Sequence, residues 1–249
     1  QATIPEDFIF GLNVMRCLVA LLVSDRNFDV GAESGDSYTT PLVMEIKGQE
    51  TLVTWGADHL TGHDPSNGKL LWTCGGFNPK KTKFWRVIAS PASAKGIVAV
   101  SYARGKVTGG IRVGGEGDIT EGAWAWKREG IGADSVSPVA DEESGTFIVL
   151  NDSEKPRGLV SCLDARSGKT LWEEQLPKAA QKFYASPLLA GNTLYLARVD
   201  GVVFSGTVEG NGLTGLTENK LDDNLYASPV AIGKRLFIRG RRNLYCFGK

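Results

Sequence analysis

The tripeptide Ser186-Pro187-Leu188 decides the fold, because it recurs at regular intervals along the chain. Its other copies are Thr40-Pro41-Leu42, Ser90-Pro91-Ala92, Ser137-Pro138-Val139 and Ser228-Pro229-Val230. Successive prolines are separated by 50, 47, 49 and 42 residues, a mean period of 47. Periods in this range are typical of propellers and solenoids, in which one supersecondary unit repeats.

A short run rich in β-forming residues follows each tripeptide and predicts a strand. These runs are residues 51–55, 96–102, 146–150, 193–197 and 235–239. A second signature, Leu163-Asp-Ala-Arg-Ser-Gly-Lys-Thr-Leu-Trp172, also occurs as His63-Asp-Pro-Ser-Asn-Gly-Lys-Leu-Leu-Trp72. It reads as a hairpin, in which Asp caps a tight turn and Gly supplies a positive φ. The central repeat keeps only the tryptophan strand, 123–127, and we expect the glycine-rich residues 105–117 to form a long connection in place of a strand.

A unit of about 47 residues cannot bury its own faces, but several units arranged radially can. The sequence therefore predicts an all-β propeller forming a single domain over residues 1–249, with five blades that start near residues 41, 91, 138, 187 and 229. The last repeat has room for only three strands. We expect residues 16–24, within an N-terminal extension 1–37, to supply the missing strand and close the ring. A helix over 12–23 is the competing interpretation.

Charge and hydropathy exclude several classes of protein. The chain has 28 Lys and Arg against 28 Asp and Glu, so no cationic excess favours nucleic acid. The longest apolar run, 14–23, is interrupted by Arg16 and is too short to span a membrane. The chain begins at Gln1 with Glu6 and Asp7 ahead of this run, which is unlike a signal peptide and indicates a trimmed form.

Over residues 38–249 these motifs resemble the pyrroloquinoline-quinone-type propeller repeat. This repeat is shared by quinoprotein dehydrogenases, by the propeller lipoprotein of outer-membrane β-barrel assembly, and by uncharacterised bacterial proteins, many of them secreted. The stretch from residue 56 to the end is most similar to the last group. The resemblance implies a propeller fold and a periplasmic or extracellular location, and it implies little about function.

The quinoprotein enzymes carry adjacent cysteines, a calcium site and about eight blades, and the sequence shows none of these. Cys17, Cys74, Cys162 and Cys246 are isolated from one another, so we expect no quinone, no calcium and no other metal. We expect buried free thiols. The closure model leaves one alternative open, a Cys17–Cys246 disulfide clasping the ring.

Candidate binding residues come from the connections that open on one face of a propeller. Those ahead of the Ser/Thr-Pro tripeptides and those between second and third strands give a rim of Tyr38, Trp85, Arg86, Arg104, Tyr184, Asp200, Tyr226 and Arg241. Such a rim fits a polar small molecule, a peptide or a polysaccharide, and a protein partner is a further option. Alternatively, the tyrosines anchor the Ser-Pro turns by hydrogen bonds. We expect Trp72, Trp126 and Trp172 to pack between blades.

The function favoured is a binding or scaffold module, because no strong catalytic motif is present. The alternative is an esterase, lactonase or glycoside-acting hydrolase that uses His59, Asp58 and Asp134 as acid and base groups. His59 and His63 are four residues apart but lie on an expected strand, which disfavours a metal pair. A quinone-dependent oxidoreductase is the third option. Residues 105–117 could also form a lid over the central channel of the expected propeller.

Overall fold

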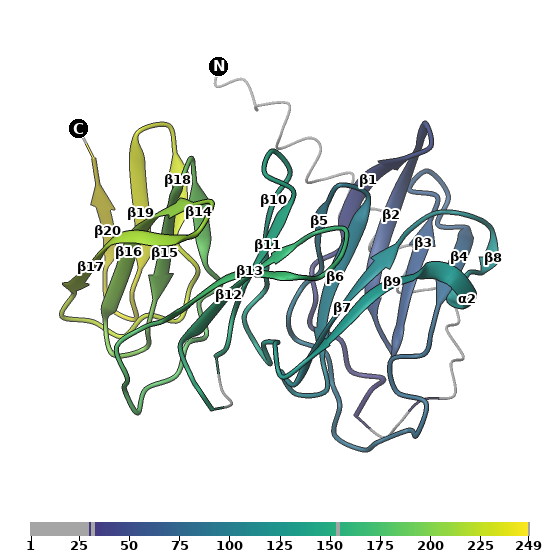
Figure 1. Ribbon diagram of the computed structural model, residues 1–249, viewed down its shortest axis with the longest axis horizontal. Coiled ribbons are helices and arrows are strands. Elements are labelled where there is room, and N and C mark those ends of the chain that lie inside the picture. The colour runs from purple at the N-terminus through teal and green to yellow at the C-terminus, as the bar shows by residue number, and fades with distance from the viewer. Residues whose placement is uncertain (1–29, 31–32, 153–154, 249) are drawn as a thin grey trace.

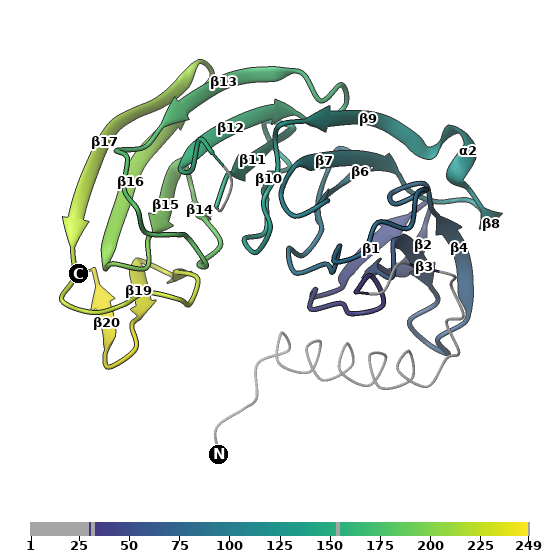
Figure 2. The same cartoon turned by 90° about the horizontal axis from the view of Figure 1, so that it is seen from below.

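The computed structural model describes residue 30 and residues 33–152 and 155–248, and these form five sheets arranged along an arc (Figures 1 and 2). Sheet one contains β1 (Leu42–Ile46), β2 (Gln49–Gly56), β3 (His59–His63), β4 (Leu70–Cys74) and the short β8 (Gly117–Asp118). Sheet two contains β5 (Ala92–Ala94), β6 (Ile97–Tyr102), β7 (Val107–Arg112) and β9 (Trp124–Glu129), which follows the single turn α2 (Thr120–Ala123).

Sheets three to five continue the pattern. Sheet three contains β10 (Val139–Asp141), β11 (Thr146–Leu150), β12 (Leu159–Asp164) and β13 (Thr170–Gln175). Sheet four contains β14 (Leu188–Ala190), β15 (Thr193–Ala197), β16 (Val202–Glu209) and β17 (Gly212–Lys220). Sheet five contains β18 (Val230–Ile232), β19 (Arg235–Arg239) and β20 (Leu244–Phe247).

The repeat predicted from sequence is confirmed strand by strand. The innermost strand of each sheet begins at the residue after the repeated proline, because proline has no N–H to donate to a strand ladder. The second strands cover the five β-rich runs, except that β6 begins one residue after the start of its run. Consecutive strands pair antiparallel, except that the short β8 pairs parallel with β4. The all-β propeller class is therefore confirmed.

The described residues form an arc and not the closed ring expected from the sequence. Sheets one and five lie at opposite ends of the arc (Figure 2). Sheet five has three strands, and the expected closing strand, 16–24, lies outside the described residues. The count of five blades in a complete propeller is not confirmed.

The tryptophans pack between sheets, as predicted. Trp72, Trp126 and Trp172 are 2%, 8% and 7% exposed. Trp126 shows the arrangement most clearly, because its indole N–H donates to the carbonyl oxygen of Ala165 in the next sheet, 2.8 Å away. The same ring lies against Gly168 of the neighbouring hairpin turn.

The glycine-rich segment corrects one expectation. Residues 107–112 form β7, the third strand of sheet two, so this segment does not replace a strand. Gly110 pairs with Trp126, and a Cβ added at Gly110 would lie 2.1 Å from the indole ring. Gly62 pairs with Trp72 in the same way, and a Cβ added at Gly62 would lie 2.1 Å from the indole ring of Trp72. Glycine is needed at both positions because the tryptophan ring of the outer strand fills the space that a side chain there would occupy.

The repeated Ser/Thr-Pro tripeptides link the sheets to one another. The first residue of one tripeptide donates its backbone N–H to the serine Oγ of the following tripeptide, at 2.9 Å in every case. The pairs are Thr40 to Ser90, Ser90 to Ser137, Ser137 to Ser186 and Ser186 to Ser228. Each serine therefore satisfies a backbone group of the preceding repeat, which explains why the hydroxyl recurs beside the proline.

Candidate functional site

Three tyrosines are exposed at the rim where the sequence placed them. Tyr38, Tyr184 and Tyr226 are 65%, 45% and 51% exposed, and each lies three residues before a repeated proline. Their hydroxyl groups make no hydrogen bond within the described part of the chain, so the turn-anchoring alternative has no support there. Exposed aromatic rings are instead available for a partner.

Tyr184 and Tyr226 form a pair between sheets four and five. Their ring centroids are 6.0 Å apart with an interplanar angle of 27°, a stacked arrangement. Tyr226 also borders a hollow of about 440 Å³, whose other lining residues are Ala227, Arg239, Gly240 and Arg241. Flat aromatic faces beside two exposed guanidinium groups suit a partner that presents carboxylates. This Tyr–Arg site is the most developed feature of the rim.

Asp223 holds the connection that carries Arg241. Its side chain is buried, and its Oδ2 accepts the backbone N–H groups of Arg242 and Asn243 at 2.9 and 3.0 Å. Burial disfavours the charged carboxylate, but the backbone hydrogen bonds from Arg242, Asn243 and Asn224 outweigh it and lower the pKa of Asp223 below its ordinary value. Asp223 thus helps to fix the β19–β20 connection, together with the hydrogen bond from the Arg241 N–H to the carbonyl oxygen of Asn224.

Asp152 has the corresponding role in sheet three. It is 1% exposed and accepts the backbone N–H groups of Asp134, Ser135 and Val136 at 2.9, 2.6 and 3.1 Å. The sequence analysis missed Asp152 and Asp223. The position of Asp152 between the second and third strands of its sheet could have marked it, since Asp58 and Asp200 occupy the same kind of connection. Its partners, residues 134–136, belong to a distant segment, so the sequence does not reveal them.

Asp200, a predicted rim residue, forms an ion pair with Arg198 of the same connection. Its Oδ1 lies 2.8 Å from Nε of Arg198 and its Oδ2 lies 3.1 Å from NH2 of the same residue. Arg198 is 6% exposed and lies over the ring of Phe204. Burial raises the pKa of Asp200, but Arg198 and Lys220 more than compensate and the net shift is downward.

The remaining rim residues lie at sheets one and two. Arg86 NH1 and Arg104 NH1 both approach Oε2 of Glu33, at 3.5 and 3.9 Å. Trp85 is half-buried and packs against the hydrophobic core of these sheets. The structure therefore gathers Arg86 and Arg104 around one carboxylate and places the Tyr184–Tyr226 pair at the other end of the arc (Figure 2).

The three candidate catalytic residues make contacts with different parts of the fold. The side chain of Asp58 accepts from Nδ2 of Asn78 at 3.0 Å. His59 Nδ1 lies 2.7 Å from the carbonyl oxygen of Ala57. Asp134 is held through its backbone by Asp152. A hydrolytic role for them stays a prediction.

The described cysteines are free thiols. Cys74 and Cys162 are buried, as expected, and burial raises the pKa of Cys74 to about 12 and that of Cys162 to about 11. Cys246 is exposed on β20, which among the described strands pairs only with β19. The thiol of Cys246 is free in the described structure, and Cys17 lies outside the described residues, so the Cys17–Cys246 clasp stays a prediction.

This arc of repeated antiparallel sheets has the β-propeller fold, and the comparisons support its resemblance to the pyrroloquinoline-quinone-type repeat. Residues 112–218 match the family described as outer membrane protein assembly factor BamB. The crystal structure of BamB from Moraxella catarrhalis superposes with a TM-score of 0.62 at 16% identity, over 88% of this chain and 60% of that one. The chain thus spans 60% of the length of that BamB.

A second solved structure shares the fold. The computationally designed Ika4 protein superposes with a TM-score of 0.53 at 13% identity, over 73% of this chain and 98% of Ika4. No curated protein sequence matches the chain. Among the described residues, no helix has the length and apolar character needed to cross a membrane.

Proposed function

We propose that this propeller is a binding scaffold that holds a partner protein at the Tyr–Arg site of sheets four and five. The observation that carries the proposal is the exposed, stacked pair Tyr184–Tyr226 beside Arg239 and Arg241. Tyrosine and arginine are enriched among the residues that dominate protein interfaces. Two stacked rings also lose little conformational freedom on binding, because each already restrains the other.

The comparisons support a protein partner over a small molecule or a polysaccharide. The matching family is described as an outer membrane protein assembly factor, and assembly requires contact with other proteins. Carrying this to the present chain, we place it in the periplasm or outside the cell. The hollow beside Tyr226 is bordered by the two exposed arginines Arg239 and Arg241, which suits one protruding acidic side chain of a partner.

Photocrosslinking tests the proposal directly. A photoreactive phenylalanine analogue at position 226 should crosslink to a defined protein in envelope extract, and Arg241→Glu should reduce that crosslink because it reverses the charge of the site. The same analogue at position 38 is the matched control, since Tyr38 occupies the same repeat position at the other end of the arc. Equal, diffuse crosslinking at both positions would contradict a specific site.

A binding screen separates the other ligand classes. Oligosaccharides and small polar molecules should give no thermal shift, whereas a ligand present at 100 times its Kd would add about 2.7 kcal/mol of stability. A saccharide that stabilises the chain, and loses this effect in the Tyr184→Ala/Tyr226→Ala variant, would assign the rim to carbohydrate instead.

A further inference from the structure

The connection between β4 and β5 is the longest of those that join one described sheet to the next. It spans residues 75–91, whereas the others span residues 130–138, 176–187 and 221–229. It contains Lys80, Lys81, Lys83 and Arg86 and no Asp or Glu. The chain as a whole has no net charge, so the positive charge of this connection is a local feature.

Two buried residues fix the start of this connection. Phe77 is 3% exposed, and its ring lies 4.5 Å from that of Trp55 and 4.6 Å from that of Trp124, measured between centroids. The next residue, Asn78, closes a turn with its side chain. Its Oδ1 accepts the backbone N–H of Thr82 at 2.8 Å, and its Nδ2 donates to the carbonyl oxygen of Thr82 at 3.1 Å. The lysines that follow are therefore carried by a turn that the protein itself holds in shape.

The end of the connection is held as well. The backbone N–H of Val87 donates to the carbonyl oxygen of Asp36 at 3.3 Å, and the carbonyl oxygen of Val87 accepts the N–H of Tyr38 at 2.9 Å. Trp85 is half-buried and packs against the core of sheets one and two. Residues 79–84, which we call the β4–β5 tip, are all exposed. The tip is thus presented to the surroundings by a connection that is anchored on both sides.

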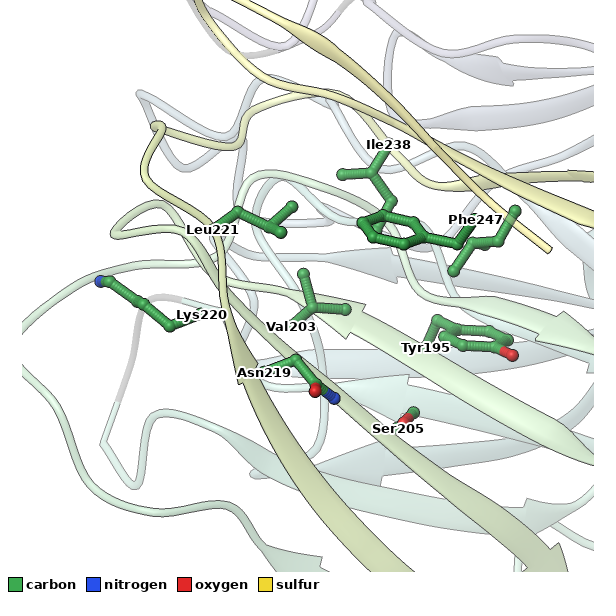
Figure 3. Close-up of a pocket in the computed structure, with 9 residues that line it drawn as sticks. Tyr195, Val203, Ser205, Asn219, Lys220, Leu221, Ile238 and Phe247 are labelled. Atoms are coloured by element: carbon green, nitrogen blue, oxygen red, sulfur yellow. The ribbon is translucent and has the colours of Figure 1, made fainter.

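Phe84 holds its ring in solvent at this tip. It is 60% exposed and makes no ring contact with any residue in the described part of the chain. Another exposed phenylalanine differs, since Figure 3 shows Ile238 and Phe247 facing Val203 and Tyr195 across the groove between sheets four and five. The backbone of Phe84 also has a φ of 66°, a left-handed conformation that is unfavourable for a bulky residue. Strain combined with an exposed apolar ring indicates a contact with another surface.

The side-chain types at the tip indicate what that surface is. Phenylalanine carries no polar group, so its ring gains free energy only by leaving water. Lysine is a compact charge on a flexible stem, whereas arginine binds carboxylates in a fixed bidentate geometry. Flexible cations beside an exposed aromatic ring suit an anionic bilayer, where the phosphate groups are mobile and an apolar layer lies just beneath them. The arginines of the Tyr–Arg site suit a protein instead.

We infer that the β4–β5 tip binds the surface of an anionic lipid bilayer. Lys80 and Lys83 lie among the headgroup phosphates, and the ring of Phe84 enters the interface beside them. Neither Lys80 nor Lys83 forms an ion pair with a residue that the structure describes, so their charges are available to lipid. The tip belongs to the connection of sheets one and two, away from the stacked tyrosines, so the inference does not rest on the proposed function.

Flotation of the full chain with lipid vesicles tests the inference. The protein should float with phosphatidylcholine vesicles that contain about 30% phosphatidylglycerol, and not with phosphatidylcholine alone, because the attraction is electrostatic. Added salt should abolish the binding. The variant Lys80→Gln/Lys83→Gln should lower the partition coefficient about twentyfold, since each basic side chain at an anionic surface contributes about fivefold. Phe84→Ala should lower it about tenfold, because the ring no longer leaves water.

Matched variants separate the tip from general charge attraction and from loss of folding. Lys69→Gln/Lys169→Gln removes the same charge and should float normally. Lys69 and the tip lie beyond opposite ends of β4, and Lys169 occupies the matching position before β13. Phe84→Trp should retain binding, because tryptophan favours membrane interfaces. Every substituted side chain except the half-buried stems of the turn is exposed, so the melting temperatures should stay unchanged.

Three outcomes would overturn the inference. The first is a chain that does not float with the anionic vesicles at low ionic strength. The second is flotation that neither Phe84→Ala nor Lys80→Gln/Lys83→Gln reduces, which would assign the contact to another part of the surface. The third is binding to poly-L-glutamate, lost in Lys80→Gln/Lys83→Gln, without binding to vesicles, which would assign the tip to an acidic protein segment. The Tyr184→Ala/Tyr226→Ala variant should float normally, so failure at the Tyr–Arg site and failure at the tip are distinguishable.

Discussion

The backbone N–H of Ser90 donates a hydrogen bond to Oγ of Ser137, 2.9 Å away in the next sheet. Ser137 in turn donates its own N–H to Oγ of Ser186 at the same distance. A serine in this position is therefore an acceptor for one sheet and a donor to the following one. The series joins all five sheets along the inner side of the arc.

Replacing one hydroxyl of this series should destabilise the fold measurably. Ser137→Ala leaves the N–H of Ser90 without its acceptor, and we expect a loss of about 1 to 2 kcal/mol in the free energy of unfolding. Ser93→Ala is the control, since Ser93 lies in the same repeat as the donor Ser90 and makes no side-chain hydrogen bond within the described residues. Urea denaturation measures both, and equal losses would show that the hydrogen bond contributes nothing specific.

The glycine beneath Trp126 should tolerate no side chain. A Cβ at Gly110 would lie 2.1 Å from the indole ring, so Gly110→Ala must displace Trp126 and should cost about 3 kcal/mol or more. Gly210→Ala is the matched control, because nothing lies within 4 Å of its added Cβ. Thermal denaturation should separate the two variants clearly, and similar melting temperatures would contradict the packing described.

The Arg198–Asp200 pair should make stability depend on pH. The folded-state pKa of Asp200 is lowered, so its contribution is present above the unfolded pKa of about 3.9 and is lost as pH falls through the folded value. Asp200→Asn should cost about 2 kcal/mol at pH 7 and flatten the acid limb of the stability profile. Asp222→Asn, at a fully exposed carboxylate, should leave both unchanged.

Thiol reactivity should follow burial. Cys246 is exposed and should react with an aromatic disulfide reagent within minutes in the native chain. Cys74 and Cys162 should react only on unfolding, because burial raises the pKa of their thiols to about 12 and about 11 and blocks access. Peptide mapping after labelling identifies each site, and native labelling of Cys162 would contradict the core described.

A scaffold should not turn over ester, lactone or glycoside substrates. His59, Asp58 and Asp134 are the residues on which hydrolysis would depend, so the assay compares the unmodified chain with His59→Ala. Turnover that is lost in His59→Ala at an unchanged melting temperature would show that the region around His59 is an active site and that the scaffold proposal is incomplete.

The repeat could be predicted because its signals are local. Proline fixes the start of each innermost strand, and the β-rich runs fix the second strands, so these elements were located to within a few residues. The glycine-rich segment was misjudged for a tertiary reason. Gly109 and Gly110 belong to a strand because Trp124 and Trp126 take the space above them, and local propensity does not reveal such a neighbour.

The sequence predicted the exposed residues of the candidate site but not the buried carboxylates that hold them in place. The exposed tyrosines follow from their fixed distance to the repeated prolines. Asp152 and Asp223 could not be found in this way, because each binds backbone groups 16 to 20 residues away that only folding brings near. Asp200 was assigned to the rim, although Arg198, two residues earlier, engages it.

The sequence by itself determined the repeating unit, the all-β class and the tryptophan packing, since these depend on short-range backbone preferences and on residues that recur at one period. Only the tertiary structure decided how the described sheets are arranged along an arc and which carboxylates hold the rim. These features depend on the angle between neighbouring sheets and on contacts between distant segments, and neither is encoded in any local stretch of the chain.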